Sequence, residues 1–537
     1  MTARVARILI FVLAAIYIFA YIVTFGVNVP FMDEWGLAPL VVAAKRHEPL
    51  WAYLWGQNNE HRLVFPRLIW ALTLPASHFN SFIGMFLSAG CGLVTLGSLA
   101  IVETRLRGTG EPDQRSVWAL LLAAALLFSP VHFDTYLWAF QFAFMAVQCF
   151  GCAAIAVLAG ARFQPAVRFA AAAGLCVLAS FSSAHGLLSW GAALPVLLLS
   201  DSFRWRRIWA VSWCLLAIAT GWIYSLGFVR RAEWGLPDIF FCLRHPMAGF
   251  RFVMCLIGAP LAQGFAGGTT RLAFWIGLLL TVALCLALWF RRHSKEQVLP
   301  VACMAIYGFL ICIAIAIGRG AWGDWLAASQ SRYMCAGVLV DVAAFLLLVR
   351  VLTFARVCWV LVAILACLSV NYRSGWTQSG SLREGRARSA ALLPILHFID
   401  RRTDLSPVSV YAPLYPFRPF AEVVRTNYEL LSEAGLKPTV DLSRELKQGP
   451  WLTCGPGSSC FVRVGTYDYQ SRSTPVMRIA GSVTPGAGTR VVLAAGDDVE
   501  RCYGAVVVPP GESHWELLIP AGMTTGPVRV WIGSIGR

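Results

Sequence analysis

The residues best suited to chemistry lie just after the first hydrophobic segment, where two carboxylates, Asp33 and Glu34, stand side by side. Charged side chains close to a bilayer cost free energy unless water or a partner is at hand, so charges gathered at one membrane edge indicate a site. A carboxylate there can act as a general base on an acceptor hydroxyl, or it can bind a divalent cation. The alternative interpretation is that Asp33 only caps the surface helix expected at 37–44.

A second polar run, Glu60-His61-Arg62, occurs later in the same loop and is followed by Arg67. The forked guanidinium group of arginine matches phosphate oxygens. Arg62 or Arg67 could therefore bind a lipid phosphate while His61 assists and Glu60 completes the site. The alternative is an interfacial arginine whose side chain reaches the lipid headgroups.

Arginine and aromatic residues mark the last polar stretch between apolar segments. Arg319 opens this stretch, Arg332 and Tyr333 close it, and Trp322 and Trp325 lie between them. The mixture suits a bound phosphate beside a stacked sugar ring. The alternative is an ordinary aromatic belt at the membrane surface.

The external loops also hold secondary candidates. Asp324 is a second candidate carboxylate, whereas His132, Asp134 and His185 are expected to be structural or to contact substrate rather than to catalyse. The sequence contains no P-loop, dinucleotide-binding fingerprint or H-E-x-x-H zinc motif. Without a nucleotide site, the energy for a reaction at the outer membrane face should arrive in an activated lipid.

Hydrophobic helices are the elements that must position these residues. The chain has 537 residues, of which 58% are hydrophobic and 13% charged, and its mean hydropathy is +0.65. These values exclude a soluble protein and indicate a polytopic α-helical membrane protein. Eleven apolar runs are long enough to span a bilayer, or nearly so: 8–27, 81–103, 117–133, 138–160, 167–183, 186–200, 208–228, 272–290, 298–318, 334–349 and 357–371.

Basic residues predict the orientation, because loops rich in arginine and lysine stay in the cytoplasm. Arg4 and Arg7 place the N-terminus inside, and alternate loops after it carry basic residues close to helix ends. The odd number of spans then places the C-terminal tail outside, and the candidate residues fall on the outer face. The net charge of +16 belongs to this pattern and not to a soluble basic domain, which excludes a nucleic-acid-binding protein and favours contact with membrane lipids.

The long loop at 229–271 does not fit this alternation. It should lie outside, yet it holds five arginines and an apolar patch at 250–262. If the patch spanned the membrane, everything after it would invert. We expect the segment 246–264 to be re-entrant or interfacial, because Arg291 and Arg292 then remain inside.

The tail changes character after residue 372. The change predicts a transmembrane domain at 1–372, with its first external loop at 28–80, and an external C-terminal domain at 373–537. Helices are expected at 382–398 and 422–434.

Short strand-like runs separated by Gly and Pro fill the tail from Cys460 onward. They predict an α+β domain with a small β-sandwich or jelly-roll-like part. The runs are 461–464, 490–493, 505–508, 515–519 and 528–532. Cys454 and Cys460 close a turn-rich loop and predict a disulfide, provided that the tail is extracytoplasmic.

The motifs of the first loop resemble those of the GT-C superfamily of membrane glycosyltransferases. They are Asp-Glu-Trp at 33–35, Asn-Glu-His-Arg at 59–62 and Pro-Arg at 66–67. Protein O-mannosyltransferases and the aminoarabinose transferase of lipid A belong to this superfamily, and the motifs look most like those of uncharacterised bacterial members. Ser-Arg-Tyr at 331–333 is similar to a further part of the pattern, and the resemblance covers roughly residues 1–372.

The resemblance implies a polyprenyl-phosphate-linked sugar as donor and a glycan or lipid as acceptor, at the periplasmic face of a bacterial inner membrane. It implies Asp33 as the general base and Glu34 as its helper or a metal contact. Phosphate binding would fall to one of three arginines: Arg62, Arg319 or Arg332. Some members need a divalent cation such as Mg²⁺ or Mn²⁺ and others do not, and the sequence leaves both open. One base without a nucleophilic partner favours direct displacement, with inversion at the anomeric carbon.

Two other functions compete with glycosyl transfer. A flippase or transporter of a lipid-linked glycan needs polar groups near the bilayer midplane, whereas the polar groups here cluster at one face. An acyl or phosphoethanolamine transferase could use His61, His132 or His185, although no paired nucleophile and base is evident in the sequence.

Overall fold

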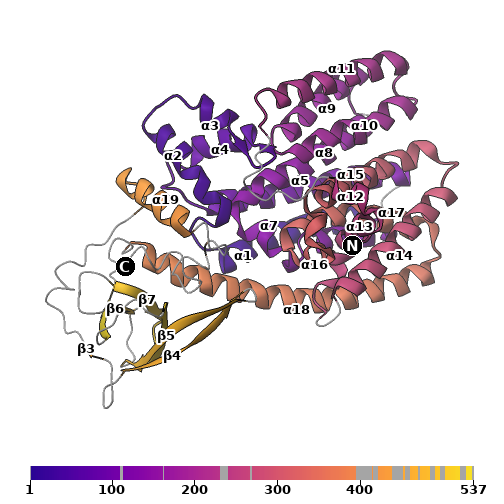
Figure 1. Ribbon diagram of the computed structural model, residues 1–537. Helices are drawn as coiled ribbons and strands as arrows, with labels where there is room; N and C mark the ends of the chain where they lie inside the picture. The colour runs from indigo at the N-terminus through magenta and orange to yellow at the C-terminus, as the bar shows by residue number, and fades with distance from the viewer. Residues whose placement is uncertain are drawn as a thin grey trace. The chain divides into compact units, whose positions relative to one another are not determined.

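Two compact units make up the chain in the computed structural model, and Figure 1 labels most of their helices and several of their strands. The structure describes residues 2–108, 113–160, 162–229, 240–265, 269–394, 414, 421–437, 452–453, 460–469, 472–483, 490–495, 502–520 and 528–534. The first unit comprises Met1–Gly26, Trp51–Trp70 and Phe82–Gly380. The second comprises Val27–Leu50, Ala71–Ser81 and Ser381–Arg537, and each unit is described by itself.

Helices form the first unit almost entirely. Its helices are α1 (Ala3–Phe25), α3 (Trp51–Trp55), α4 (Val64–Thr73), α5 (Phe82–Arg107), α6 (Gln114–Leu127), α7 (Phe133–Leu137), α8 (Phe142–Ala159), α9 (Pro165–Ser180), α10 (Leu188–Leu199), α11 (Arg206–Ser225), α12 (Phe241–Arg244), α13 (Pro246–Ala262), α14 (Thr269–Phe290), α15 (Lys295–Arg319), α16 (Asp324–Ser329), α17 (Met334–Val351) and α18 (Phe354–Leu392). Short 3-10 helices lie between them: η2 (Pro130–His132), η3 (Ala139–Gln141), η4 (Ala184–Leu187), η6 (Gly320–Trp322) and η7 (Ser331–Tyr333). One hairpin joins β1 (Gln57–Asn58) to β2 (His61–Arg62).

Several of these helices are long enough to cross a bilayer, where the backbone must satisfy its own hydrogen bonds. Within the described residues nine helices have the required length and apolar composition: Ala3–Phe25, Phe82–Arg107, Gln114–Leu137, Ala139–Ala159, Arg206–Ser225, Thr269–Phe290, Lys295–Trp322, Ser331–Val351 and Phe354–Leu392. They coincide with nine of the eleven predicted spans, and the chain is a multi-pass helical membrane protein. The other two predicted spans, 167–183 and 186–200, form shorter apolar helices.

The apolar patch in the long loop forms α13, which lies alongside the short helix α16. Arg251, near the start of α13, pairs with Asp324 at 2.8 Å, at the start of α16. Gln263, just after α13, donates to the carbonyl oxygen of Ser329 at 3.3 Å, at the end of α16. Both ends of α13 therefore lie beside one six-residue helix, which favours the expected re-entrant or interfacial segment over a crossing one.

Glycines let α13 pack against its neighbours at backbone contact. A Cβ atom added to Gly258 of α13 would lie 1.9 Å from the carbonyl oxygen of Ala273 in α14. One added to Gly277 of α14 would lie 1.9 Å from the carbonyl oxygen of Met254. This close approach fixes α13 and α14 to each other, and with them the loop that carries Asp324.

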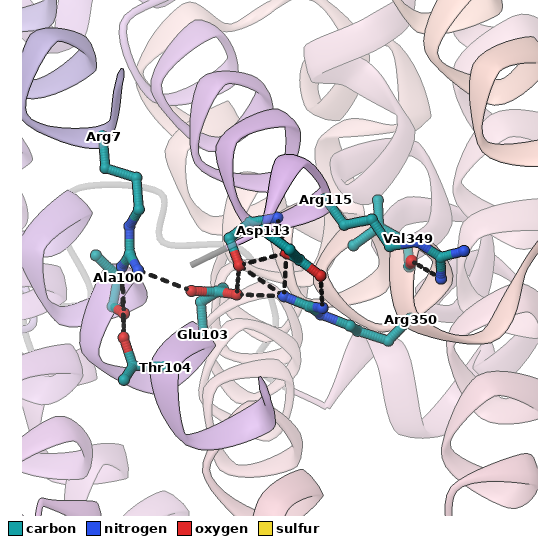
Figure 2. Close-up of polar contacts among 9 residues, drawn as sticks. Arg7, Ala100, Glu103, Thr104, Asp113, Arg115, Val349 and Arg350 are labelled. Atoms are coloured by element: carbon teal, nitrogen blue, oxygen red, sulfur yellow. Dashed lines mark hydrogen bonds and ion pairs between the residues drawn. The ribbon is translucent and has the colours of Figure 1, made fainter. Parts of the chain in front are cut away.

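Charged side chains tie four helices together where α17 ends (Figure 2). Arg350 of α17 lies 2.7 Å from Asp113, the N-cap of α6, and 2.7 Å from Glu103 of α5. The hydroxyl of Ser116 donates to Glu103 at 2.6 Å, and Arg7 of α1 lies 3.4 Å from the other oxygen of Glu103. Only 2% of Glu103 is exposed, so the network replaces water for a buried carboxylate.

The second unit combines first-loop residues with the tail. It contains η1 (Met32–Leu37), α2 (Ala38–Lys45), the last turns of α18 and α19 (Ala421–Glu433). Lys45 donates to the carbonyl oxygen of Ala434 at 2.6 Å, and the Trp35 and Tyr428 rings lie 6.4 Å apart. The sequence had placed these first-loop residues in the transmembrane domain, whereas here they pack with the tail.

Two antiparallel sheets form the strand part of the second unit. Their orders are β3-β9-β6-β7 and β4-β5-β8. The strands are β3 (Leu452–Thr453), β4 (Cys460–Tyr469), β5 (Arg472–Ser482), β6 (Arg490–Ala495), β7 (Cys502–Val508), β8 (His514–Pro520) and β9 (Arg529–Ser534). Buried side chains from both sheets, including Ile479, Val492 and Ile519, share one hydrophobic core.

The expected tail elements have mixed outcomes. The five predicted strands and the helix at 422–434 are confirmed, while β5 was missed because Pro475 and its polar first residues are not typical of a strand. The helix expected at 382–398 is the continuation of the last membrane span, since α18 runs unbroken for 39 residues as far as Leu392. Cys460 is disulfide-bonded, and its expected partner Cys454 lies outside the described residues.

Candidate functional site

A tight hairpin in the first unit presents Glu60 and His61. Asn58 pairs with His61 across the two strands, and Asn59 at the turn has a φ of 50°, a left-handed conformation that asparagine tolerates. The turn leaves the Glu60 side chain 33% exposed, while His61 is 5% exposed. The hairpin thus places a carboxylate at its tip and an imidazole in the interior beside it.

The Glu60 carboxylate lies between a guanidinium group and an imidazole. Its Oε1 is 3.1 Å from Nη2 of Arg319 at the end of α15, and 3.6 Å from Nε2 of His61. Its Oε2 is buried and has no hydrogen-bond partner in the part of the chain that the structure describes. Burial acts to raise the pKa of Glu60, but the attraction of His61 and Arg319 outweighs it, and the pKa is lowered.

Three contacts fix the His61 ring. The backbone N–H of Ala184 donates to its Nδ1 at 3.4 Å, and the hydroxyl of Ser183 lies 3.2 Å from the same atom. Since a backbone N–H can only donate, Nδ1 is an acceptor and a neutral ring carries its proton on Nε2, which faces Glu60. Burial lowers the pKa of His61 despite the opposing effect of Glu60, which favours this neutral form. The Ser183 hydroxyl also lies 3.2 Å from Nδ1 of His185.

Aromatic rings surround the arginines of the last external loop. Arg319 lies over the Trp322 ring at 5.0 Å, and its Nε donates to the Tyr333 hydroxyl at 3.4 Å. Arg332 lies 5.0 Å from the Tyr333 ring and 5.5 Å from that of Trp138. Two guanidinium groups and the rings of Trp138, Trp322 and Tyr333 therefore lie together, and Arg319 joins this group to Glu60. We call the set Glu60, His61, His185, Arg319 and Tyr333 the Glu60 cluster.

Arg62 has a different environment from the one the phosphate interpretation requires. Its guanidinium group donates to the carbonyl oxygens of Trp55 at 2.6 Å, of Tyr224 at 2.7 Å and of Leu226. It also lies over the Trp55 ring at 4.6 Å, and it is 1% exposed. Two of its five donors thus hold the hairpin to the end of α11 and a third holds it to the end of α3. Two donors are left, and phosphate binding by Arg62 stays a prediction.

Of the secondary candidates, His185 belongs to the Glu60 cluster, and the other three occupy separate positions in the first unit. Nε2 of His132 lies 3.0 Å from the carbonyl oxygen of Leu126, and His132 is 1% exposed. The backbone N–H of Asp134 donates to the Ser331 hydroxyl at 2.9 Å, which ties α7 to the residue before Arg332. The Asp324 carboxylate is paired with Arg251, as described above.

The acidic pair of the first loop belongs to the second unit, and its two members differ. Asp33 is half-buried, whereas Glu34 is 2% exposed and accepts the backbone N–H of Phe31 at 3.0 Å. Burial raises the pKa of Glu34 to about 8, against the opposing effects of Phe31, Ser81, Arg386 and Lys437. Glu34 therefore lies in the core of this unit, and Asp33 is the more exposed of the two carboxylates.

Metal binding has little support in the described residues. Within them no group of three His, Cys, Asp or Glu side chains could hold an ion. The expected cation would have two carboxylates, Asp33 and Glu34, and the second faces the core.

Sequence reasoning missed two polar residues. Ser183 was counted among the polar residues of the external loops but was given no role, although the run Ser182-Ser183-Ala184-His185 interrupts two apolar segments. Asp341, midway along α17, is fully buried and neither carboxyl oxygen has a hydrogen-bond partner among the described residues. The signal for Asp341 was plain, because it is a lone carboxylate in an apolar run.

The Glu60 cluster can hold an anion, offer rings to a flat or apolar ligand face and accept a proton at a carboxylate. Comparison with protein-family models, with curated proteins and with solved structures gave no match.

Proposed function

We propose that this protein is a membrane glycosyltransferase of the GT-C type, which moves a sugar from a polyprenyl-phosphate donor to a hydroxyl of a glycan or lipid acceptor. The observation that carries the proposal is that Arg319 and Arg332 both lie against aromatic rings and share the Tyr333 side chain, with Arg319 also paired to Glu60. Arginine forks bind phosphate oxygens, and ring faces suit a sugar. The long apolar helices leave the lipid chain of such a donor in the bilayer beside the site.

The reaction needs a base, an electrophile and a stabilised leaving group. Asp33 would take the proton of the acceptor hydroxyl, whose oxygen attacks the anomeric carbon. The bond from that carbon to the phosphate oxygen breaks, and polyprenyl phosphate leaves with the electron pair. Arg319 and Arg332 would stabilise the negative charge that develops on the phosphate, and one displacement inverts the anomeric centre.

Location follows from the same reasoning. The arginine-rich loops expected on one side and the Glu60 cluster expected on the other support a reaction at the external face of a bacterial inner membrane, with the C-terminal domain in the periplasm. A lipid-linked donor suits this face because it needs no nucleotide there.

Asp341 is the observation that favours a second candidate, a flippase of lipid-linked glycans. A transporter uses polar groups at the depth of the helix centre, and Asp341 is such a group. Its neighbours in α17, Val338, Val342 and Phe345, are apolar and buried. A single carboxyl group among apolar side chains is weak support for a transport path. The Glu60 cluster is stronger support for glycosyl transfer.

An acyl or phosphoethanolamine transferase is the third candidate. Ser183, His61 and Glu60 stand in the order of a nucleophile, a base and an orienting acid. Ser183, however, is fully buried and shares its hydroxyl between two imidazoles, which argues against attack on a substrate.

The test is a transfer assay with the purified protein in nanodiscs and a polyprenyl-phosphate sugar. Asp33→Asn should lower the rate by about a hundredfold or more, since general base catalysis contributes at least that much. The matched control is Asp201→Asn, which removes one partner of the exposed pair with Arg206. Unchanged turnover in Asp33→Asn would reject Asp33 as base. Passage of the lipid across liposomes without a covalent product would favour the flippase, and a product without added sugar mass would favour the third candidate.

A further inference from the structure

Glu60 is the only carboxylate in contact with Arg319 among the residues that the structure describes. Their 3.1 Å contact joins two partly exposed side chains, with 33% of Glu60 and 16% of Arg319 accessible. An ion pair that solvent reaches is worth little free energy and can be replaced by another anion. The contact is therefore exchangeable in a way that the buried pair of Glu103 and Arg350 is not.

The remaining contacts of Arg319 do not depend on Glu60. Its Nη1 donates to the carbonyl oxygen of Gly318 at 2.9 Å, its Nε donates to Tyr333, and its plane lies over Trp322. These three contacts hold the guanidinium group in place if the carboxylate leaves. Arginine has five donors in a fixed fork, so a phosphate could take up the Nη2 that Glu60 uses now.

His61 is a second possible partner of the Glu60 carboxylate. His61 Nε2 lies 3.6 Å from the same oxygen that contacts Arg319, and the Ala184 N–H on the opposite ring nitrogen keeps the Nε2 proton directed at Glu60. A small movement of the carboxylate therefore exchanges a guanidinium donor for an imidazole donor. The carboxylate need not become unpaired at any stage.

We infer that Glu60 occupies the phosphate site of the free protein: its carboxylate pairs with Arg319 until the phosphate of a lipid ligand takes its place, and it then pairs with His61. The inference deepens the proposed function, on which its choice of ligand rests. It assigns Glu60 the role of an internal competitor for Arg319, so that only an anion able to displace a carboxylate enters the site. A neutral glycolipid would leave the pair closed.

The direction of the change in binding when Glu60 is removed distinguishes a competitor from a residue that only positions Arg319. Removing a competitor strengthens binding, whereas removing a residue that positions Arg319 weakens it. Glu60→Gln should bind a short-chain polyprenyl phosphate about fivefold more tightly than the original protein, the size of one exposed ion pair. Arg319→Gln should bind it at least tenfold more weakly, and the double variant should match Arg319→Gln, because the competitor matters only when its target is present.

The measurement is the dissociation constant of the full chain in nanodiscs at one pH and ionic strength, with thermal melting to confirm folding. Glu60→Ala provides a second test with a different side chain, and Asp201→Asn is the control. Inorganic phosphate and vesicles of anionic phospholipid are tested in parallel. If either binds as tightly and responds to Glu60→Gln in the same way, the exchange stands and the polyprenyl ligand is rejected.

Weaker or unchanged binding in folded Glu60→Gln and Glu60→Ala would overturn the exchange, while sugar transfer by the original protein would still support the proposed function. Tighter binding without any sugar transfer would reject the proposed function and keep the exchange. Absence of phosphate binding in every variant would reject both.

Discussion

Glu34 is a buried acid whose protonation should couple the stability of the second unit to pH. Its pKa is raised from about 4.5 to about 8, mainly by burial, so the folded protein keeps the proton over a range where the unfolded chain loses it. Stability should therefore fall as pH rises from about 5 to about 8. The effect over this window is on the order of a few kcal/mol.

Glu34→Gln removes this titration and keeps the shape of the protonated acid. Thermal melting followed by intrinsic tryptophan fluorescence should show that the melting temperature of the variant rises relative to that of the original protein between pH 5 and pH 7.5. The window stops there because burial also lowers the pKa of Lys437 to about 8, and the lysine adds a trend of opposite sign above that pH. Parallel melting curves across the window would mean that Glu34 is ionised in the fold.

Residue types could be predicted from the sequence better than residue roles. Arg319, Arg332 and Tyr333 were expected to share a site, and the structure places them together, at the two ends of the segment between α15 and α17. Asp33 and Glu34 looked equivalent, yet consecutive side chains leave a helical turn in different directions, so only one could face the core. Two of the partners of Arg62, Tyr224 and Leu226, lie more than 160 positions along the chain, where no local pattern indicates them.

At the scale of elements, the network around Arg350 is the feature with the largest expected effect on stability. Arg350→Met leaves Glu103 buried with Arg7 as its remaining cation, and such a change typically costs about 3–5 kcal/mol. The double variant with Glu103→Leu should recover part of the loss, because it removes the buried charge as well. Arg206→Met is the matched control in an exposed pair, where about 1 kcal/mol or less is expected.

Chemical or thermal unfolding in mixed micelles measures these variants together with the single variant Glu103→Leu and the original protein. Losses that simply add in the double variant would contradict an energetic coupling between Arg350 and Glu103. Since α17 has 18 residues, the network lies about 27 Å from the Glu60 cluster, and phosphate binding should survive where the protein stays folded.

Membrane spans were predictable because a helix in lipid must be apolar over about 20 residues. The ends of helices outside the bilayer were harder to predict from the sequence. α18 continues past its apolar part through Arg383, Glu384 and Arg388, where helix-forming residues rather than hydrophobicity sustain it. The division into units was also hidden, because the packing of 27–50 with the tail depends on contacts between distant residues such as Lys45 and Ala434.

At the scale of the whole molecule, the contact between Glu60 and Arg319 constrains the topology. The two residues touch, so an even number of crossings must separate them. The helices that could cross between them, apart from α13, are α5, α6, α8, α9, α10, α11, α14 and α15. Eight is even, whereas a crossing α13 would make nine and put the two residues on opposite faces.

Epitope tags inserted in the full chain test this directly. Tags at 233 and 267, on either side of α13, should both be reached by antibody from outside in spheroplasts, whereas a tag at 293 should be reached only after permeabilisation. The first two agree because both ends of α13 lie beside α16, and the third differs because Arg291 and Arg292 hold their loop inside. A tag at 267 that needs permeabilisation while the tag at 233 does not would make α13 a crossing helix. It would then be incompatible with the 3.1 Å contact on which the Glu60 cluster depends.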